Sequence, residues 1–217
     1  MGLFCSLREG FKGKHTHVAK MLHGFYTNKM LQLKLFETEN AQKLTIDLFS
    51  AYFNARKNKR NTINALAFEK HFESSLFNLC DDIIDYRYIP KPSICFIVDS
   101  PVKREVFAAD FRDRVVHHLI YNYISPIFEK IFINDSYSCR IGKGTHYGIK
   151  RIDHFIRSCS RNYTRDCYIL KLDIKGYFMA MNKTLLFQKV KKELVKRKNK
   201  LNFDLPLVLY LIEKTIF

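Results

Sequence analysis

The 217-residue sequence has few acidic residues, little glycine or proline, and no long apolar run. It holds 21 Asp and Glu against 37 Lys and Arg, so its formal net charge is +16 at pH 7. Eight Gly and five Pro are too few for a collagen-like or linker-like chain. No apolar run approaches the about 20 residues of a membrane span, and no basic start with an apolar stretch indicates a secretory signal.

The six cysteines form no Cys-x-x-Cys pair and no cluster with histidine. A zinc knuckle is therefore not expected, and reduced thiols in a cytoplasmic protein are the simplest interpretation. Hydrophobic residues make up 47% of the chain, which is too many for a disordered basic tail. A folded chain with this excess of positive charge is typical of proteins that bind a polyanion, and nucleic acid is the first candidate.

Residues 1–40 show no clear apolar periodicity and are predicted to form an N-terminal arm. The first residues, MGLFCS, fit the short pattern for N-myristoylation at Gly2. Such a short pattern often arises by chance, and an irregular N-terminal segment without lipidation is the simpler alternative.

Helical periodicity begins near Asn40, where Leu44, Leu48 and Tyr52 recur on one face. This helix runs into a cluster of positive charge at residues 56–60. Asp204 has the position of an N-cap for a last helix. Further helices are expected at about 64–86, 112–131, 145–159, 182–198 and 205–217.

Two β-rich runs, 94–98 and 105–108, lie on either side of a segment that contains Pro101, and they predict an antiparallel hairpin. Residues 167–173 predict a buried strand that ends at Asp173. The expected fold class is α+β, mostly helical with a small antiparallel sheet.

Asp173 is the first candidate for chemistry. A carboxylate at the end of a buried strand is costly unless a metal or another partner compensates its charge. Mg²⁺ takes oxygen ligands of this kind and relies on substrate phosphates for others. The alternative is an aspartate that caps the next helix, and the segment alone does not decide between the two.

Several cationic segments could contact phosphates. Lys103 and Arg104 lie at the predicted hairpin and could hold a polyphosphate, although an ordinary charged turn is the alternative. Arg140 and Lys143 lie in a loop with two glycines that allows close approach of a nucleic-acid backbone; it lacks the spacing of a P-loop. Residues 56–60 and 189–200 are also rich in Lys and Arg and are either solvated or in contact with phosphates.

The start of the long helix carries Arg112, Asp113 and Arg114. Asp113 suits the helix dipole and could pair with either arginine. His117 and His118 follow, but consecutive helical residues point in different directions, so they are not expected to share a metal.

Taken in order, three of these stretches resemble the N-terminal conserved blocks of reverse transcriptases of bacterial retroelements. Residues 104–116, REVFAADFRDRVV, resemble the fingers block, whose sequence in group II intron relatives is roughly R-P-L-G-I-P-x-x-x-D-R. Residues 136–144, SYSCRIGKG, resemble the next block, and residues 170–178, LKLDIKGYF, the first catalytic block. The residues of these blocks are most similar to those of enzymes from diversity-generating retroelements, and retron and group II intron enzymes are the next most similar. The resemblance covers about residues 45–200.

The resemblance implies an RNA-directed DNA polymerase that acts on an RNA template, a DNA or RNA primer and dNTPs with two Mg²⁺ ions. A small basic accessory protein accompanies the diversity-generating branch. The chain would then comprise the N-terminal arm at 1–40, a fingers-like region at 41–160 and the start of a palm at 161–217.

The resemblance also implies roles for single residues. Asp173 and the carbonyl of Ile174 would bind metal, and Phe178 would exclude the 2′-OH of a ribonucleotide. Lys103 and Arg104 would hold the incoming triphosphate. Contacts to nucleic acid would come from Arg56, Lys57, Lys59, Arg60, Arg112, Arg114, Arg140 and Lys143.

One departure from the family concerns the other two catalytic carboxylates, which belong to a Tyr-x-Asp-Asp turn well after the first. The only acids after Asp173 are Glu193, Asp204 and Glu213, and the Asp81-Asp82 pair lies upstream, where it is interpreted as a solvated helix patch.

We therefore expect an N-terminal part of a longer enzyme that is inactive by itself. The alternative is a catalytically inactive, basic RNA-binding remnant. A helical DNA-binding regulator would explain the charge but not the ordered blocks.

Overall fold

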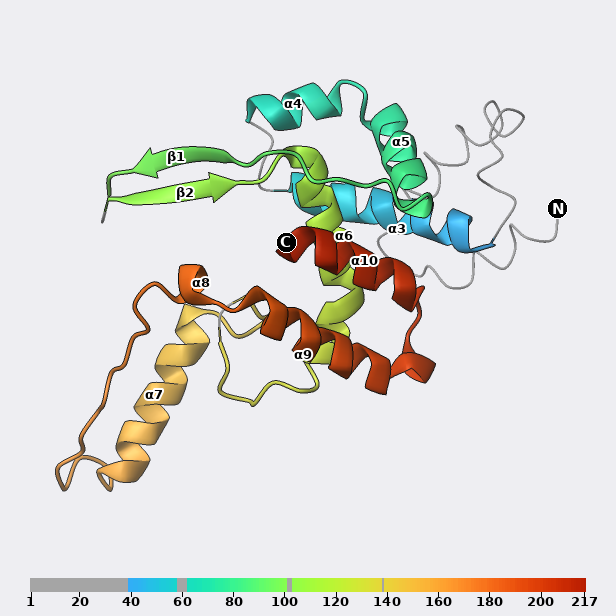
Figure 1. The fold of residues 1–217 in the computed structure, drawn as a ribbon. Coiled ribbons are helices and arrows are strands. Elements are labelled where there is room, and N and C mark those ends of the chain that lie inside the picture. The colour runs from blue at the N-terminus through green and yellow to red at the C-terminus, as the bar shows by residue number, and fades with distance from the viewer. Residues whose placement is uncertain (1–38, 58–61, 101–102, 138) are drawn as a thin grey trace. The chain divides into compact units, whose positions relative to one another are not determined.

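The structure is a computed structural model that describes residues 39–57, 62–100, 103–137 and 139–217 (Figure 1). These residues are mostly helical and contain one two-stranded antiparallel sheet, as the α+β expectation requires. They divide into two compact units, which are described separately. Unit 1 takes the described residues up to Asn122 together with Phe187–Phe217, and unit 2 is Tyr123–Leu186.

The predicted N-terminal arm, with the pattern at Gly2, lies almost wholly outside the described residues. None of the helices in the described ranges is long and apolar enough to cross a membrane. The three-part division inferred from the family resemblance stays a prediction.

In unit 1, helix α3 (Glu39–Arg56) buries Leu44, Leu48 and Tyr52 on one face, at the predicted spacing. The helix expected at about 64–86 is divided into α4 (Ile63–Glu69) and α5 (Phe72–Ile84). Helix α4 buries only Ala65, whereas α5 buries a full apolar stripe, and both α3 and α4 contact α5.

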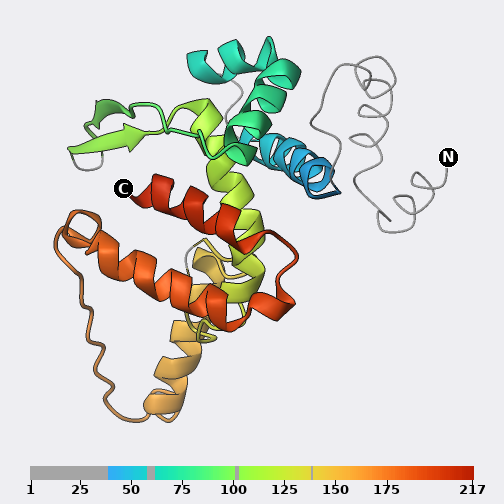
Figure 2. The ribbon, with the colours of Figure 1, turned by 45° about the vertical axis from the view of Figure 1, so that its right-hand side comes forward.

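Helix α6 (Phe111–Phe128) buries Val115, Val116 and Leu119 within unit 1. In Figures 1 and 2 this part of α6 crosses α3 and α10 (Leu205–Ile216). Helix α9 (Lys183–Lys196) is followed by a short 3₁₀ turn (Lys198–Lys200) and then by α10. The rings of Phe187 and Phe217 lie 6.2 Å apart, so α9 and α10 are antiparallel neighbours.

Tyr52 lies at the centre of an aromatic cluster that joins α3, α4, α5 and α6. Its ring stacks on Phe72 at 5.0 Å and 9°, and it meets the edge of Phe111 at 6.1 Å. Phe68 of α4 lies 5.9 Å away. Each fully buried apolar side chain of this kind contributes about 1.5–3 kcal/mol to stability, so the cluster is a main source of the stability of unit 1.

The predicted hairpin is confirmed. Strand β1 (Ile94–Val98) pairs antiparallel with β2 (Arg104–Ala108), with Ile94 opposite Ala108 and Val98 opposite Arg104. Most side chains on both faces are exposed. The hairpin therefore extends from the unit without a covering layer (Figure 1).

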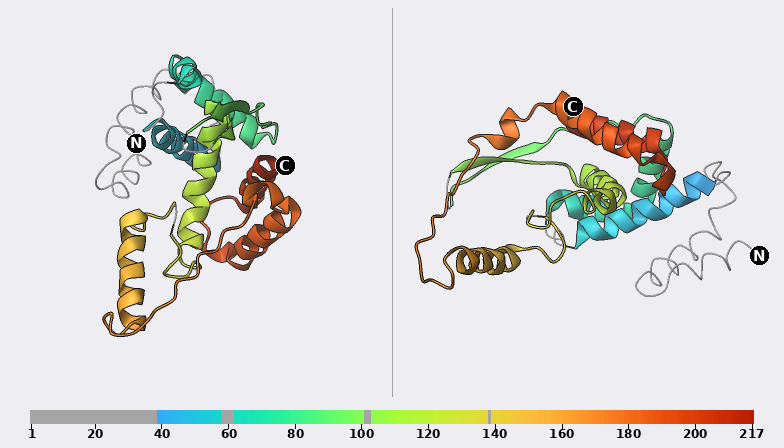
Figure 3. Two further views of the ribbon diagram at one scale, coloured as in Figure 1. Left: turned by 90° about the vertical axis from the view of Figure 1, so that its left-hand side faces the viewer. Right: turned by 90° about the horizontal axis from the view of Figure 1, so that it is seen from below.

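Unit 2 contains α7 (Thr145–Cys159) and the short helix α8 (Tyr177–Ala180). Neither helix buries a residue. The connecting chain, residues 161–176, includes a long extended stretch (Figures 1 and 3).

The prediction of a buried strand at 167–173 is wrong. These residues form no strand, and Tyr168, Leu170 and Leu172 are exposed, as is Asp173. A strand needs a neighbour to satisfy its backbone N–H and C=O groups. In the described part of the chain the only sheet is β1–β2, so no strand lies beside this segment.

Candidate functional site

Asp173 lies in an exposed turn of unit 2. The backbone N–H of Ile174 donates a hydrogen bond of 2.9 Å to Asp173 Oδ1, which orients the carboxylate. Gly176 has φ 63°, a left-handed conformation that favours glycine, and a Cβ placed there would meet open space. The conformation of the turn, not crowding, therefore requires glycine before α8.

Phe178 follows in α8 and is 84% exposed. Its ring meets only the edge of Tyr177 among the described ring contacts, at 5.2 Å. Phe178 therefore does not pack in a core in this structure. Its role against a 2′-OH stays a prediction.

The described residues do not make a complete Mg²⁺ site. No three His, Cys, Asp or Glu side chains among them lie together in a way that could hold a metal. Asp173 supplies one carboxylate and Ile174 one carbonyl, whereas two-metal catalysis requires ligands for both ions beside the phosphate.

Lys103 and Arg104 are exposed at the hairpin of unit 1. Arg104 is the first residue of β2 and lies opposite Val98. Both cations are accessible to an anionic ligand. Asp173 belongs to unit 2, and each group is described within its own unit.

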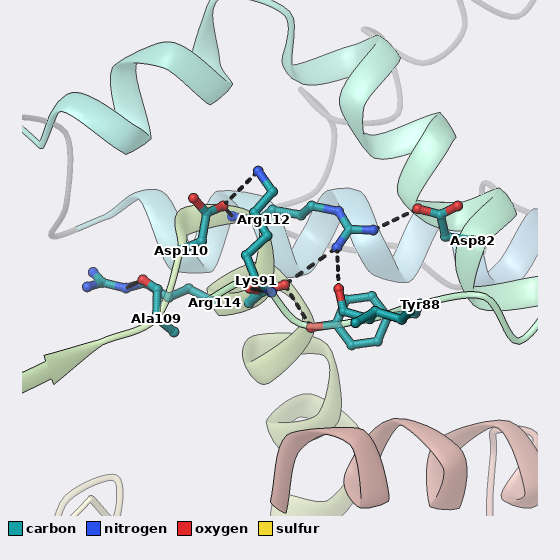
Figure 4. Close-up of polar contacts among 9 residues, drawn as sticks. Asp82, Tyr88, Lys91, Ala109, Asp110, Arg112 and Arg114 are labelled. Atoms are coloured by element: carbon teal, nitrogen blue, oxygen red, sulfur yellow. Dashed lines mark hydrogen bonds and ion pairs between the residues drawn. The ribbon is translucent and has the colours of Figure 1, made fainter. Parts of the chain in front are cut away.

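A partly buried polar cluster lies at the start of α6 (Figure 4). We call it the α6 cluster and define it as Asp82, Tyr88, Lys91, Arg112 and Asp113. Asp113 is 1% exposed. It accepts hydrogen bonds from Tyr88 Oη at 2.9 Å and from the backbone N–H of Lys91 at 2.8 Å. These bonds hold the chain between α5 and β1 against α6.

Arg112 completes the α6 cluster from the other side. Its Nη2 donates to Asp82 Oδ2 at 2.7 Å, and its Nη1 donates to the carbonyl of Ile89 at 3.2 Å (Figure 4). Its guanidinium carbon lies 5.0 Å from the centre of the Tyr88 ring. The side chain is 17% exposed, so these contacts account for most of its surface.

The interpretation of Asp81-Asp82 as a solvated patch is wrong. Asp82 pairs with Arg112, because its position on α5 faces the start of α6. Asp81 Oδ1 is buried and has no hydrogen-bond partner among the described residues. Burial raises the pKa of Asp81, and the nearby carboxylates of Asp85 and Asp82 raise it further.

Burial also raises the pKa of Tyr88, and the Asp113 carboxylate adds to this effect. The Tyr88 hydroxyl therefore stays protonated and acts as a donor. The Tyr88 carbonyl accepts a 2.8 Å hydrogen bond from Tyr210 Oη of α10. Tyr88 thus links α10 to α6. In the sequence, the only sign of this role was a tyrosine shortly before Pro90.

The neighbouring charges have structural partners as well. Asp110 accepts the N–H of Arg112 at 3.0 Å, which caps α6, and lies 3.5 Å from Lys91 Nζ. Arg114 Nε donates to the carbonyl of Ala109 at 3.0 Å. Arg112 and Arg114 therefore stabilise the start of α6, and their contacts with nucleic acid stay a prediction.

Arg140 has a similar structural role in unit 2. Its side chain is 7% exposed and forms an ion pair with Glu129 at 2.9 Å. It also donates to the carbonyls of Ile133 and Ser136, at 2.9 and 2.8 Å. Arg140 therefore holds the loop that follows α6.

Asp135 joins this loop to α7. It accepts hydrogen bonds from Arg151 at 2.6 and 2.9 Å and from Tyr137 Oη at 2.8 Å. The hydrogen bonds from Arg151 lower the pKa of Asp135 to about 2. Lys143 Nζ donates to Asn134 Oδ1 at 2.9 Å. The loop with the two glycines is thus held by the contacts of Arg140 and by the hydrogen bond from Lys143 to Asn134.

The remaining predicted contacts lie near the end of α3. Arg56 pairs with Glu69, and Lys57 donates to Asn54 Oδ1 at 3.0 Å. Lys59 and Arg60 lie outside the described residues.

The 189–200 segment presents what we call the α9 lysine surface. Its only acid, Glu193, pairs with Arg197. Its exposed members are Lys189, Lys191, Lys192, Lys196, Lys198 and Lys200.

Comparison with known proteins gives one weak likeness. No protein-family model matches the chain. The chain is similar to Protein YkfC of Escherichia coli (strain K12), with 25% identity over 134 residues, which is 61% of this chain and 35% of that protein. The chain thus spans about a third of the length of this curated relative. The likeness assigns no activity.

Proposed function

We propose that the chain forms the fingers and the start of the palm of an RNA-directed DNA polymerase of the bacterial retroelement type. The ordered blocks of sequence support the proposal. The single structural observation that carries it is the turn at Gly176, where the Asp173 carboxylate and the Phe178 ring are both exposed. Because both side chains are exposed near one turn, both are accessible to a ligand.

Nucleic acid would bind mainly through cations that are not engaged inside the protein. The α9 lysine surface, Lys103 and Arg104 meet this condition by their exposure. Lysine contacts to phosphates position a strand without reading its sequence, which suits a template-directed enzyme. A small basic accessory protein, and the diversity-generating branch in particular, are finer parts of the same proposal.

The proposal requires two further carboxylates that no residue pair after Asp173 supplies in these 217 residues. We therefore expect the chain alone not to extend a primer. The decisive test uses a polypeptide that contains these residues together with a Tyr-x-Asp-Asp turn. Such a protein extends a DNA primer on an RNA template, Asp173→Asn abolishes extension, and Asp204→Asn, the matched control, leaves it unchanged. Extension that survives Asp173→Asn contradicts the proposal.

Phe178 tests substrate choice in the same polypeptide. A rigid ring beside the sugar would exclude a 2′-OH by a clash. Phe178→Val then lowers the ratio of kcat/KM for dNTP over rNTP. An unchanged ratio in folded protein rejects this role.

The second candidate function is a catalytically inactive RNA-binding protein. The α9 lysine surface favours it, because exposed lysines can contact the phosphates of RNA without a metal site. It predicts RNA binding that Asp173→Asn does not alter, and no extension in any longer polypeptide.

A further inference from the structure

Residues 168–174, which we call the unpaired segment, are exposed and belong to the extended stretch of unit 2 (Figures 1 and 3). Among the described residues, the backbone N–H and C=O groups of 168–173 make no hydrogen bond to another backbone group. A row of such groups on an extended chain is a template on which another strand can pair. The unpaired segment therefore has the backbone of an open sheet edge.

The side chains of the unpaired segment alternate in the way that a strand requires. In a strand, one face would carry four apolar side chains that are all strongly exposed here: Tyr168, Leu170, Leu172 and Ile174. The other face would carry Ile169 together with Lys171 and Asp173, which have opposite charges and lie two residues apart. A contiguous row of exposed apolar side chains marks a site of association.

The two charges select one way in which two copies of the segment can pair. In an antiparallel pair centred on Leu172, Lys171 of each chain lies opposite Asp173 of the other, twice in the pair. On the apolar face, Leu172 then lies opposite its own copy and Leu170 opposite Ile174. A parallel pair in register would place lysine opposite lysine and aspartate opposite aspartate, which is unfavourable. Charge and apolar pattern thus favour the same antiparallel register.

We propose that the unpaired segment is a self-association surface, through which two copies of this chain pair as antiparallel strands about Leu172. Main-chain hydrogen bonds between the strands supply the attraction, and the alternating side chains supply the specificity, as in other cases of strand addition. The two pairs of Lys171 with Asp173 fix the register. A ribbon of two strands is only marginally stable in water, so the dimer is weak and forms at high chain concentration.

Pairing would have a consequence for the turn at Asp173. In the dimer its carboxylate lies beside Lys171 of the other copy, so self-association competes with any ligand of Asp173. The dimer itself does not depend on the proposed polymerase activity, because it uses the backbone and side chains of the segment whether or not Asp173 binds a metal. The two proposals can therefore fail separately.

Sedimentation equilibrium of the 217-residue chain tests whether the dimer forms. At about 0.15 M salt the Debye length is about 8 Å, so repulsion between two chains of charge +16 is largely screened. We expect the average mass to rise from the 25.8 kDa of one chain towards twice that value as the concentration approaches about 1 mM. A mass that stays at 25.8 kDa over this range overturns the proposal.

Charge reversal tests the register. Lys171→Asp places acids opposite acids, and Asp173→Lys places lysines opposite lysines, so each variant should weaken the dimer roughly tenfold or more. The double variant restores opposite charges and should dimerise like the wild type. A mixture of the two single variants should also pair, because the acids of one chain then face the lysines of the other. Failure of both rescues contradicts the proposal.

A matched control separates this effect from net charge. Lys191→Asp changes the net charge by the same amount as Lys171→Asp, but on the exposed side of α9, and should leave the dimer unchanged. Equal weakening in both variants would show that the association is not carried by the unpaired segment. Circular dichroism confirms that each variant is folded.

A cysteine at the centre of the pair tests the geometry. Directly opposite residues of an antiparallel pair have Cα atoms about 4.5–5.5 Å apart, which suits a disulfide. Mild oxidation should therefore link two chains of Leu172→Cys several-fold faster than two chains of Ile169→Cys, whose cysteines would lie about 20 Å apart along the ribbon. The wild-type chain, oxidised in parallel, measures linkage through the native cysteines. Equal rates in the two variants contradict the proposed register.

Discussion

The two units are stabilised in different ways. Every buried apolar side chain among the described residues lies in unit 1, where α3, α4, α5, α6, α9 and α10 all contribute to an aromatic and aliphatic core. Among the described residues of unit 2, only Ser160 is buried, and the helices are held by ion pairs and by hydrogen bonds to carbonyls. Ion pairs near the protein surface contribute about 0–1 kcal/mol each. We therefore expect unit 2 to open at a lower free energy than unit 1.

Charged residues differ in exposure within each unit as well. Asp113 of unit 1 is buried and Arg140 of unit 2 is 7% exposed, and both hold the fold, whereas Asp173 of unit 2 is exposed and makes its described hydrogen bond with the next residue. Charge in a motif therefore does not by itself indicate a ligand. Exposure separates the cations that hold the fold from those that we propose contact RNA.

One of the two largest expected effects is in the core of unit 1. Leu48→Ala removes a fully buried side chain and should lower the free energy of unfolding by about 2–5 kcal/mol. The matched control in unit 2, Ile152→Ala, changes an exposed residue of α7 and should shift it by no more than about 0.5 kcal/mol. Urea denaturation measures both. Equal losses would remove the distinction between the units.

The buried carboxylate of the α6 cluster comes next. Asp113→Ala leaves the Tyr88 hydroxyl and the Lys91 N–H without their acceptor and should cost about 3–5 kcal/mol. Tyr88→Phe should cost about 1–2 kcal/mol. Because the two residues share one hydrogen bond, the double variant should be less destabilised than the sum of the two. Strict additivity in urea denaturation contradicts the described contact.

A smaller effect concerns the pH dependence of unit 2. The pKa of Asp135 is depressed to about 2, so its stabilising contribution is present above the ordinary aspartate pKa and is lost as pH falls through about 2. Amide exchange in α7 should therefore stay constant from neutral pH down to about pH 4, after correction for the intrinsic rate, and rise below it. Asp135→Asn should show the faster exchange already at neutral pH. A wild-type rise near pH 6 would assign the link to another group.

The smallest effect on stability is expected at Phe178. Because its ring is 84% exposed, Phe178→Ala should change the free energy of unfolding by no more than about 0.5 kcal/mol. Thermal or urea denaturation of the chain measures this. A loss of about 3–5 kcal/mol would instead indicate a packed core residue.

The sequence predicted what local patterns determine. The face of α3 and the β1–β2 hairpin follow from periodicity and turn residues, and the structure confirms both. Asp204 takes the predicted N-cap position of α10, although its side chain makes no capping hydrogen bond. Periodicity also predicted one helix where the structure has α4 and α5, because it does not reveal that α4 buries only Ala65.

Contacts between distant residues were not predictable in this way. Arg112 meets Asp82, and Tyr210 meets Tyr88, only once the helices have packed. The error at 167–173 has the same origin, because an apolar β-rich run becomes a strand only when another strand lies beside it. Of the candidate site, Asp173 is exposed and does not end the buried strand that the sequence predicted, and the roles of its residues remain predictions.

The salt dependence of RNA binding by the 217-residue chain is the most direct test of the central claim that its exposed lysines bind RNA. If about five phosphates are contacted, the slope of log K against log salt should be about −3 to −4 for single-stranded RNA. Replacing Lys189, Lys192 and Lys196 with Gln should bring the slope closer to zero by about 0.7 for each lysine that contacts a phosphate. Fluorescence anisotropy with a labelled single-stranded RNA measures both slopes. A flat salt response, or an unchanged slope in the triple variant, would contradict the account.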